Sequence, residues 1–314
     1  MTSLSAPDIV GALSERVVGR RRELEVLVAA LVADRHVLLE GPPGTGKSTI
    51  LREVAAAAGT GFVFVEGNAE LTPARLAGQF DPSRVLEDGY TPDVFVDGPL
   101  VEALRHGSLL YVEELNRVPE ETVNLLITVM SEGELTLPRL GTIPAADGFR
   151  LVAAMNPFDN IGTARVSGAV YDRMCRIAMG YQSLDDESDI VVRNTSEDDR
   201  VLRRRAVAVT RGTRNHPDVR VGSSVRGAID LVEVGHALAS MRSAQVTDPS
   251  VGLDAALTAL SGRIRLHEGG SSTPESVITD LWDAVLAQEH PRDDDDDSSS
   301  GKATAPDGAT PASP

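Results

Sequence analysis

The stretch at residues 37–50, VLLEGPPGTGKSTI, constrains the fold of this chain more than any other. It contains the full G-x-x-x-x-G-K-[ST] pattern of a phosphate-binding loop. The apolar residues before the loop predict a short buried strand, and those after it predict the start of a helix. Because the pattern binds phosphate in this strand–loop–helix setting, we predict a nucleotide site rather than an ordinary glycine-rich turn.

Each part of this loop has a physical role. Its glycines let backbone N–H groups face a phosphate, and the N-terminus of the following helix adds partial positive charge. The amine of Lys47 would reach the outer phosphates, and the hydroxyl of Ser48 would hold Mg²⁺. The predicted nucleotide-binding residues here are Gly41, Pro42, Pro43, Gly44, Thr45, Gly46, Lys47, Ser48 and Thr49.

A second stretch, SLLYVEELNRVPEET at residues 108–122, places two acids at the end of a predicted strand. Ligands of open α/β sheets lie beyond the carboxyl ends of the strands, which is where Glu113 and Glu114 stand. Adjacent strand residues face opposite ways. We therefore expect Glu113 to organise the Mg²⁺ water shell and Glu114 to deprotonate the attacking water. Asn156, at the end of the predicted strand 149–156, could hydrogen-bond the same water. The alternative for Glu113 and Glu114 is that they are two solvated acids before a turn.

A third segment, RVVGRRRE, precedes the loop and separates two predicted helices between residues 8 and 31. In a nucleotide-binding chain, Val18 and Gly19 could lie along the adenine and offer it backbone hydrogen bonds. The alternative is a simple connection between two helices, and the sequence leaves both open.

The charge balance argues against a broad nucleic-acid surface. The net charge is −17, with an isoelectric point near 4.8, whereas such surfaces need Lys and Arg to neutralise phosphates. Lys47 and Lys302 are the only lysines among 30 basic residues. A GC-rich genome and a salt-adapted acidic proteome both explain this composition. The basic run at 200–211 is amphipathic, and we interpret it as a helix face in an oligomer contact.

The cysteine content, the histidine spacing and the hydropathy of the sequence bear on disulfides, metal sites and cellular location. A single cysteine, Cys175, excludes a disulfide framework, and its apolar surroundings predict a small buried side chain. The histidines show no metal-ligand spacing. No apolar run reaches membrane-spanning length, and the first residues lack the pattern of a signal peptide, so a cytoplasmic location is expected.

The motifs together resemble a known family. The set GPPGTGKS, LLYVEELNR and LVAAMNP is similar to AAA+ ATPases, as are the later VSGAVYDRM, GYQSLDDESDIV and TRNHPDVRVGSSVRGAIDL. Within AAA+ the chain most closely resembles the MoxR family, from about residue 16 to residue 288. This resemblance implies a three-layer α/β/α P-loop NTPase domain with a parallel sheet at residues 1–180. A small all-α lid domain would follow at 181–290, and an acidic tail at 291–314 without apolar periodicity should be disordered.

The resemblance also assigns roles to individual residues. The phosphate loop matches Walker A, Glu113 and Glu114 match the Walker B acids, and Asn156 matches sensor 1. Arg226 matches the sensor-2 arginine, and Arg173 matches an arginine finger donated to a neighbouring subunit. Paired with Asp172, Arg173 could instead be an ordinary surface arginine, and Arg226 could be a helix-start cation. Glu113 departs from the family, which usually has Asp, so we expect nucleotide binding with slower hydrolysis.

The implied function is that of an ATP-dependent, Mg²⁺-requiring ring motor, a hexamer by resemblance. It would remodel a protein complex in a chaperone-like way or insert a metal or cofactor, with a von Willebrand A-type protein as a partner. One alternative is an ATP-binding oligomeric scaffold with little turnover, which Glu113 motivates. The other is the motor subunit of a nucleic-acid enzyme, against which the acidic balance speaks.

Overall fold

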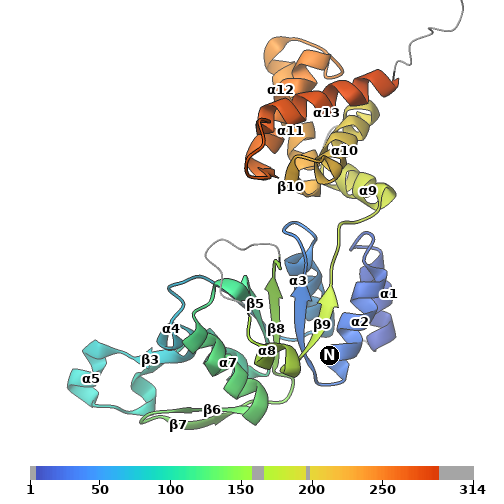
Figure 1. Ribbon diagram of the computed structural model, residues 1–314. Coiled ribbons are helices and arrows are strands. Elements are labelled where there is room, and N and C mark those ends of the chain that lie inside the picture. Colours follow the sequence, from blue (N-terminus) through green and yellow to red (C-terminus); the bar gives the residue numbers. More distant parts are fainter. Residues whose placement is uncertain (1–4, 158–165, 196–198, 290–314) are drawn as a thin grey trace, which may run out of the picture.

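The computed structural model describes residues 5–157, 166–195 and 199–289 (Figure 1). A five-stranded sheet with all strands parallel and the order β2–β5–β8–β1–β9 lies at the centre of the N-terminal part. Its strands are β1 (His36–Glu40), β2 (Phe62–Glu66), β5 (Leu109–Glu113), β8 (Arg150–Met155) and β9 (Met174–Ala178). The apolar runs 37–39, 62–65, 109–112 and 149–156 predict four of these strands, whereas no run in the sequence predicts β9.

Helices cover both faces of this sheet. They are α1 (Ala6–Ser14), α2 (Arg21–Val32), α3 (Lys47–Ala58), α6 (Pro99–His106), α7 (Glu120–Glu132) and α8 (Gly168–Arg173). Strand residues alternate between the faces: Val37 and Leu39 pack with α1, α2 and α3, whereas Leu38 packs with α6 and α7 in a separate apolar cluster. The predicted three-layer α/β/α arrangement is confirmed.

Two insertions extend this part of the chain (Figure 1). Residues 81–99, which are rich in Pro, Gly and Asp, predict an inserted turn or hairpin, and the segment GELTLPRLGTIPAADG before the strand at 149–156 has the character of a hairpin. In the structure the first comprises α4 (Pro73–Ala77), β3 (Gly78–Phe80), α5 (Pro82–Asp88), η1 (Pro92–Val94) and β4 (Phe95–Asp97). The second is the antiparallel pair of β6 (Glu134–Leu137) and β7 (Gly141–Pro144).

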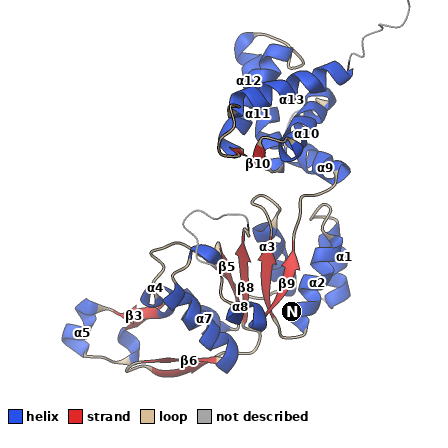
Figure 2. Cartoon of the chain, viewed as in Figure 1, coloured by secondary structure: helices blue, strands red, loops and turns tan. Residues whose placement is uncertain are grey.

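The C-terminal part is mainly helical (Figure 2). It has a core of its own that includes Trp282. Its helices are α9 (Leu184–Asn194), α10 (Arg200–Asn215), α11 (Val225–Arg242), α12 (Pro249–Leu260) and α13 (Pro274–Glu289). A short antiparallel pair, β10 (Val219–Val221) with β11 (Arg265–Leu266), and the turn η3 (Ser261–Arg263) interrupt them, so this part is not purely helical. The tail predicted to be disordered lies outside the described residues.

Strand β9 also corrects the interpretation of Cys175, whose side chain is exposed rather than buried. The strand lies at the edge of the sheet, beside β1 alone. Met174 and Ile177 are buried there, while Cys175 and Arg176 are exposed. An apolar neighbourhood in the sequence was therefore a poor guide to burial at this edge strand.

His36, at the start of β1, gives the fold a pH dependence. Its Nδ1 accepts a hydrogen bond of 2.9 Å from the backbone N–H of Leu151, and burial, aided by the charge of Arg35, lowers its pKa. The unfolded chain therefore binds more protons here, so this contribution is present above pH ~6.5 and is lost as the pH falls below it. Relative to His36→Asn, the wild type should lose about 1 kcal/mol of unfolding free energy per pH unit below ~6.5. Denaturant unfolding of both proteins across this range is the measurement, and parallel pH profiles would contradict the assignment.

Candidate nucleotide-binding site

The predicted phosphate loop connects β1 to α3. Gly44 and Gly46 adopt φ values of +73° and +85°, which side chains beyond glycine rarely tolerate. Gly46 is the N-cap of α3 and no side chain caps this helix, so its first N–H groups face no side-chain acceptor. A hydrogen bond of 2.9 Å from Thr45 Oγ1 to the carbonyl of Pro42 closes the loop. This geometry leaves a helix N-terminus ready for a phosphate.

Lys47 is folded back over the same loop. Its Nζ donates hydrogen bonds of 2.9 and 2.8 Å to the carbonyls of Gly41 and Pro42, and the residue is only 8% exposed. Burial lowers the pKa of Lys47 to about 8, against the opposing effect of Glu113. The amine is thus held over the loop by two neutral acceptors that the oxygens of a phosphate could replace.

Glu113 and Ser48 lie together, as the two motifs predicted. Ser48 Oγ donates a hydrogen bond of 2.9 Å to Glu113 Oε1 and lies 3.3 Å from the hydroxyl of Tyr111. Hydroxyl and carboxylate oxygens are the ligands that Mg²⁺ prefers, with phosphates and water completing its shell. Within the described part of the chain, no group of three or more His, Cys, Asp or Glu residues could hold a metal by itself. The donor set therefore fits a cation that arrives with its nucleotide.

Glu114 lies just beyond the strand in an uncommon backbone conformation. Its φ of +53° and ψ of 46° are left-handed, and the short turn η2 (Leu115–Arg117) follows. Such values are rare for residues other than glycine, and strain of this kind clusters at functional sites. Glu114 Oε2 lies 3.1 Å from Arg117 Nε, so the acid predicted to activate water is paired within its own turn.

Gly67 is a residue of this site that sequence reasoning missed. Its N–H donates a hydrogen bond of 2.7 Å to the carbonyl of Glu113. A Cβ at this position would lie 2.5 Å from the carbonyl oxygen of Glu114 and 2.6 Å from that of Glu113. Only glycine allows β2 to end so close to both acids. Its place after the predicted strand 62–65 was the available signal.

Asn156 lies immediately after β8, which is between β5 and β1 in the sheet. It lines a cavity of about 170 Å³ together with the start of the phosphate loop and residues of the helical part. The other lining residues are Pro42, Pro43, Tyr181, Arg214, Arg220, Val221 and Gly222. The structure thus brings the predicted water-binding amide beside the phosphate loop.

A larger cavity, of about 420 Å³, lies on the other side of the loop. Val17 and Val18 from the lead-in segment and Ile190 and Ile229 from the helical part supply apolar walls suited to a flat base. Its complete lining is Arg16, Val17, Val18, Arg20, Gly44, Thr45, Gly46, Thr49, Gln182, Ile190, Arg193, Asn194, Val225, Arg226 and Ile229. Six predicted nucleotide-binding residues are therefore placed at the cavity: Val18, Gly44, Thr45, Gly46, Thr49 and Arg226.

Gly19, predicted beside them, is not part of that lining. It has a φ of +67°, and a Cβ there would lie 2.5 Å from Asp186 Cγ of α9. Gly19 therefore lets the lead-in segment pack closely against the helical part.

Arg20 braces the phosphate loop, which the sequence did not reveal. Its NH2 donates hydrogen bonds of 3.1 Å to the carbonyl of Thr45 and 2.6 Å to that of Gly180, and its NH1 lies 3.1 Å from Glu23. The side chain is 3% exposed. Nothing in the charge run RVVGRRRE distinguishes this arginine from its neighbours, because the contacts join segments far apart in the chain.

Arg173 lies at the end of α8 and is absent from the residues that line the two cavities. Its Nε donates a hydrogen bond of 2.6 Å to Ser131 Oγ of α7, and its NH1 donates to the carbonyl of Ala169. NH1 also lies 3.5 Å from Asp172, and the side chain is 35% exposed. The predicted finger is thus held on the surface of its own subunit.

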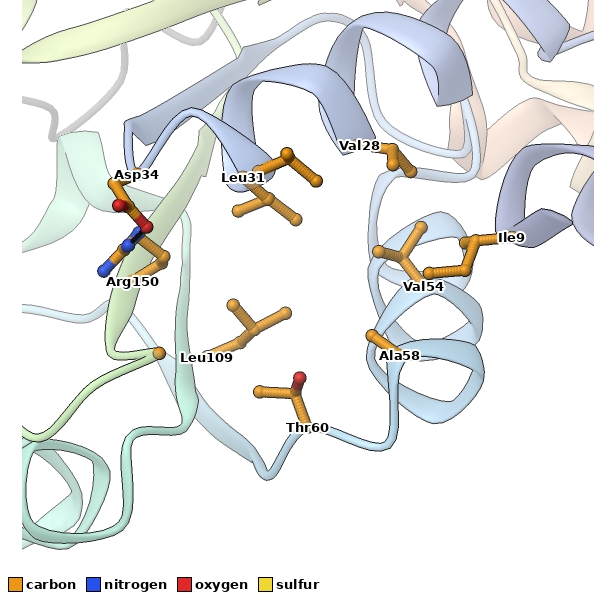
Figure 3. Close-up of a pocket in the computed structure, with 11 residues that line it drawn as sticks. Ile9, Val28, Leu31, Asp34, Val54, Ala58, Thr60, Leu109 and Arg150 are labelled. Atoms are coloured by element: carbon orange, nitrogen blue, oxygen red, sulfur yellow. Dashed lines mark ion pairs between the residues drawn. The ribbon is translucent and has the colours of Figure 1, made fainter. Parts of the chain in front are cut away.

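A third cavity lies elsewhere, at the amino-terminal ends of β5 and β8 (Figure 3). It has a volume of about 200 Å³ and an apolar lining that includes Ile9, Val28 and Leu109. Figure 3 shows the ion pair of Asp34 with Arg150 at one side. None of the predicted site residues lines it, and the phosphate loop, the two acids and Asn156 lie at the opposite ends of the strands.

The fold is that of the AAA+ P-loop NTPases. Residues 36–174 match the family model of the AAA domain (dynein-related subfamily). RuvB of Thermotoga maritima, described as a Holliday junction branch migration motor, has a similar fold. Its TM-score is 0.52 at 17% identity, over 79% of this chain and 72% of that chain.

Relatives by sequence agree with this class. Gas vesicle ATPase GvpN1 of Halobacterium salinarum is 28% identical over 263 residues, which cover 79% of this chain and 74% of that protein. The uncharacterized protein YeaC of Bacillus subtilis is 28% identical over 305 residues, 86% of this chain and 91% of the relative. Together with the family match, these likenesses support an AAA+ ATPase at the level of the family.

Proposed function

We propose that this chain is an ATP-hydrolysing motor of the MoxR type that works as a homo-oligomeric, hexameric ring. The observation that carries the proposal is the hydrogen bond between Ser48 and Glu113 beside the buried Lys47. It brings the two motifs to one place at the carboxyl ends of β1 and β5. A phosphate chain lying on the loop would meet an ammonium and a pair of oxygen ligands there.

The chain's own residues divide the chemistry among them. The loop N–H groups and Lys47 bind and orient the phosphates, while Glu114 accepts the proton of the attacking water and Asn156 orients that water. Mg²⁺, held by Ser48 and Glu113, would neutralise charge on the outer phosphates. Glu114 is paired with Arg117 through Oε2, which holds its carboxylate close to the turn at the end of β5.

The ring and the client are the further parts of this proposal. Arg173 would complete the site of the adjacent subunit, and Arg226 of α11 would couple the helical lid to the nucleotide. The lid would span 181–290, after an ATPase domain at 1–180 and before the tail at 291–314. The motor would remodel a protein complex or insert a metal or cofactor, with a von Willebrand A-type partner, in the cytoplasm. No helix in the described ranges is long and apolar enough to span a membrane.

A nucleic-acid motor is the weaker alternative, because four arginines of α10 are paired with acids of the helical part. Arg204 and Arg205 pair with Glu289 at 2.7 and 2.8 Å. Arg211 and Arg214 pair at 2.8 and 2.7 Å with Glu187, whose side chain is 1% exposed. The interpretation of the run as a helix face in an oligomer contact stays a prediction, since the side chain of Arg204 is 68% exposed. DNA-stimulated ATPase with a steep salt dependence would restore the nucleic-acid alternative.

Glu113→Asp tests how the longer acid at this position affects turnover. Shortening this side chain withdraws its carboxylate from Ser48 by roughly a bond length, and displacements near that size cost up to about a hundredfold in rate. Because the shorter side chain would lose this hydrogen bond, we expect the variant to bind ATP and to turn it over about tenfold more slowly than the wild type. Steady-state ATPase with ATP titration is the measurement. A variant faster than the wild type would instead mark a motor that evolved to be slow.

The direct test of the proposed function is the specific ATPase activity of the wild type as a function of its concentration, with the oligomeric state followed by sedimentation. A site shared between subunits predicts specific activity that rises as rings assemble. If rings form and bind ATP but hydrolyse none, the scaffold replaces the motor.

A further inference from the structure

Glu40 is a buried acid directly before the phosphate loop. It is the last residue of β1 and is 4% exposed, after three apolar residues that are buried in the core. Its carbonyl accepts a hydrogen bond of 2.6 Å from the N–H of Met179, which fixes the backbone at this point. A buried carboxylate is costly unless it is paired and hydrogen-bonded, so its partners show what it is used for.

Both partners come from the segment that carries the candidate finger. The Tyr171 hydroxyl in α8 donates a hydrogen bond of 2.6 Å to Glu40 Oε1, and Arg176 Nε of β9 pairs with Glu40 Oε2. Burial and the bond to Glu40 raise the pKa of Tyr171 to about 12, so its hydroxyl is protonated and donates at neutral pH. Tyr171 and Arg176 are both exposed, at 40% and 55%. The cluster therefore reaches from the end of β1 to the surface beside α8.

Helix α8 depends on a few contacts for its position. It spans only Gly168–Arg173, and Val170 is its one buried residue. Tyr171 precedes Arg173 by two positions, and Arg173 itself is bonded to Ser131 of α7. The hydroxyl of Tyr171 therefore links α8 to β1. The guanidinium of Arg173, which would act in the adjacent subunit, is bonded to α7.

We propose that Glu40, acting through Tyr171, positions Arg173 for the adjacent subunit and joins that finger to the phosphate loop of its own subunit. Glu40 and Gly41 share one peptide bond, and the carbonyl of Gly41 accepts the hydrogen bond of Lys47. Glu40 therefore links, through its backbone and its side chain, the lysine that would contact the phosphates to the helix that would serve the adjacent subunit. This assignment rests on the proposed shared site, and Glu40 and Tyr171 are positioning residues rather than catalytic ones.

Mixed rings test the proposal, because they separate the subunit that owns a site from the subunit that lends its finger. Arg173→Ala subunits keep their own site but lend no finger, and Glu114→Gln subunits lend a finger but cannot turn over ATP. An equimolar mixture should regain activity that neither variant has alone. Tyr171→Phe is then added to one kind of subunit at a time, since this change removes the hydroxyl and keeps the aromatic ring of the side chain.

The result expected is asymmetric. Tyr171→Phe in the finger-lending Glu114→Gln subunit should lower kcat of the mixture about tenfold, as misplacement of a reacting group by a fraction of an ångström does, with KM unchanged. The same change in the site-owning Arg173→Ala subunit should leave kcat within about twofold. Glu40→Gln in the lending subunit should show the same asymmetry, with folding checked by thermal unfolding. If Glu40→Gln does not fold, the Tyr171→Phe pair alone decides.

Other outcomes have separate meanings. Equal loss of activity from either subunit would mean that the hydroxyl supports the structure of its own subunit. No loss from either subunit would mean that the hydroxyl has no role in turnover. Each of these results would overturn the positioning role. A failure of the Arg173→Ala and Glu114→Gln mixture itself to regain activity would instead overturn the shared site of the proposed function. The two failures are distinguished before Tyr171 is changed.

Discussion

Glu114→Gln is expected to lower ATP turnover by about 10²–10⁴-fold while ATP remains bound, which is the range that a positioned general base contributes. The amide has nearly the shape of the carboxylate but cannot take a proton from water. Binding is preserved because the phosphates would contact the loop N–H groups and Lys47, which this change leaves in place. Single-turnover hydrolysis and equilibrium titration of ATP measure the two effects separately.

The structure gives this experiment a matched control. Glu121→Gln, at the start of α7, makes the same chemical change at an exposed acid a few residues along that lines neither nucleotide cavity. It should leave turnover within about twofold, as surface changes remote from a site usually do. Turnover of Glu114→Gln within tenfold of the wild type would remove Glu114 from the role of base. The proton would then have to leave by another route.

The sequence anticipated the parts of the fold that local chemistry determines. The phosphate loop needs a strand before it and a helix after it, so eight consecutive residues place β1 and α3. Continuous apolar runs likewise located β2, β5 and β8, because strands covered on both faces are apolar throughout. From these elements alone, the meeting of Ser48 with Glu113 could be anticipated, since parallel strands end at one edge.

Contacts between distant segments were beyond such reasoning. The strand β9 mixes buried and exposed residues because it lies at the sheet edge, so its periodicity is weak. Arg20 and Glu40 resemble many other charged residues in the sequence, and only the folded chain shows that both are buried against the loop region. The left-handed turn at Glu114 was equally hidden, because no glycine marks it. For β9, Arg20 and Glu40 the determining contacts are made with residues distant in the sequence. For Glu114 the determining feature is a backbone dihedral angle.

Arg173→Ala is expected to have the largest effect, a loss of about 10³–10⁵-fold in kcat, as removal of an arginine finger produces in enzymes of this class. The physical reason is charge: a guanidinium at the transferred phosphate stabilises the transition state far more than the bound substrate. Affinity for ATP should therefore change little, and the loss should persist at every protein concentration. ATPase assays across concentrations, with the assembly state monitored, give both quantities.

Asp172→Ala decides between this role and an ordinary surface pair. Arg173 NH1 lies 3.5 Å from Asp172, whose side chain is 81% exposed, and exposed pairs contribute about 0–1 kcal/mol to stability. If the pair were the purpose of Arg173, both variants would behave alike and neither would affect turnover strongly. If Arg173 acts on a neighbour's nucleotide, Asp172→Ala keeps turnover within about twofold while Arg173→Ala loses nearly all of it. Equal, small effects would mean that Arg173 is not an arginine finger. It would then have no role at a nucleotide, because it lines neither nucleotide cavity of its own subunit.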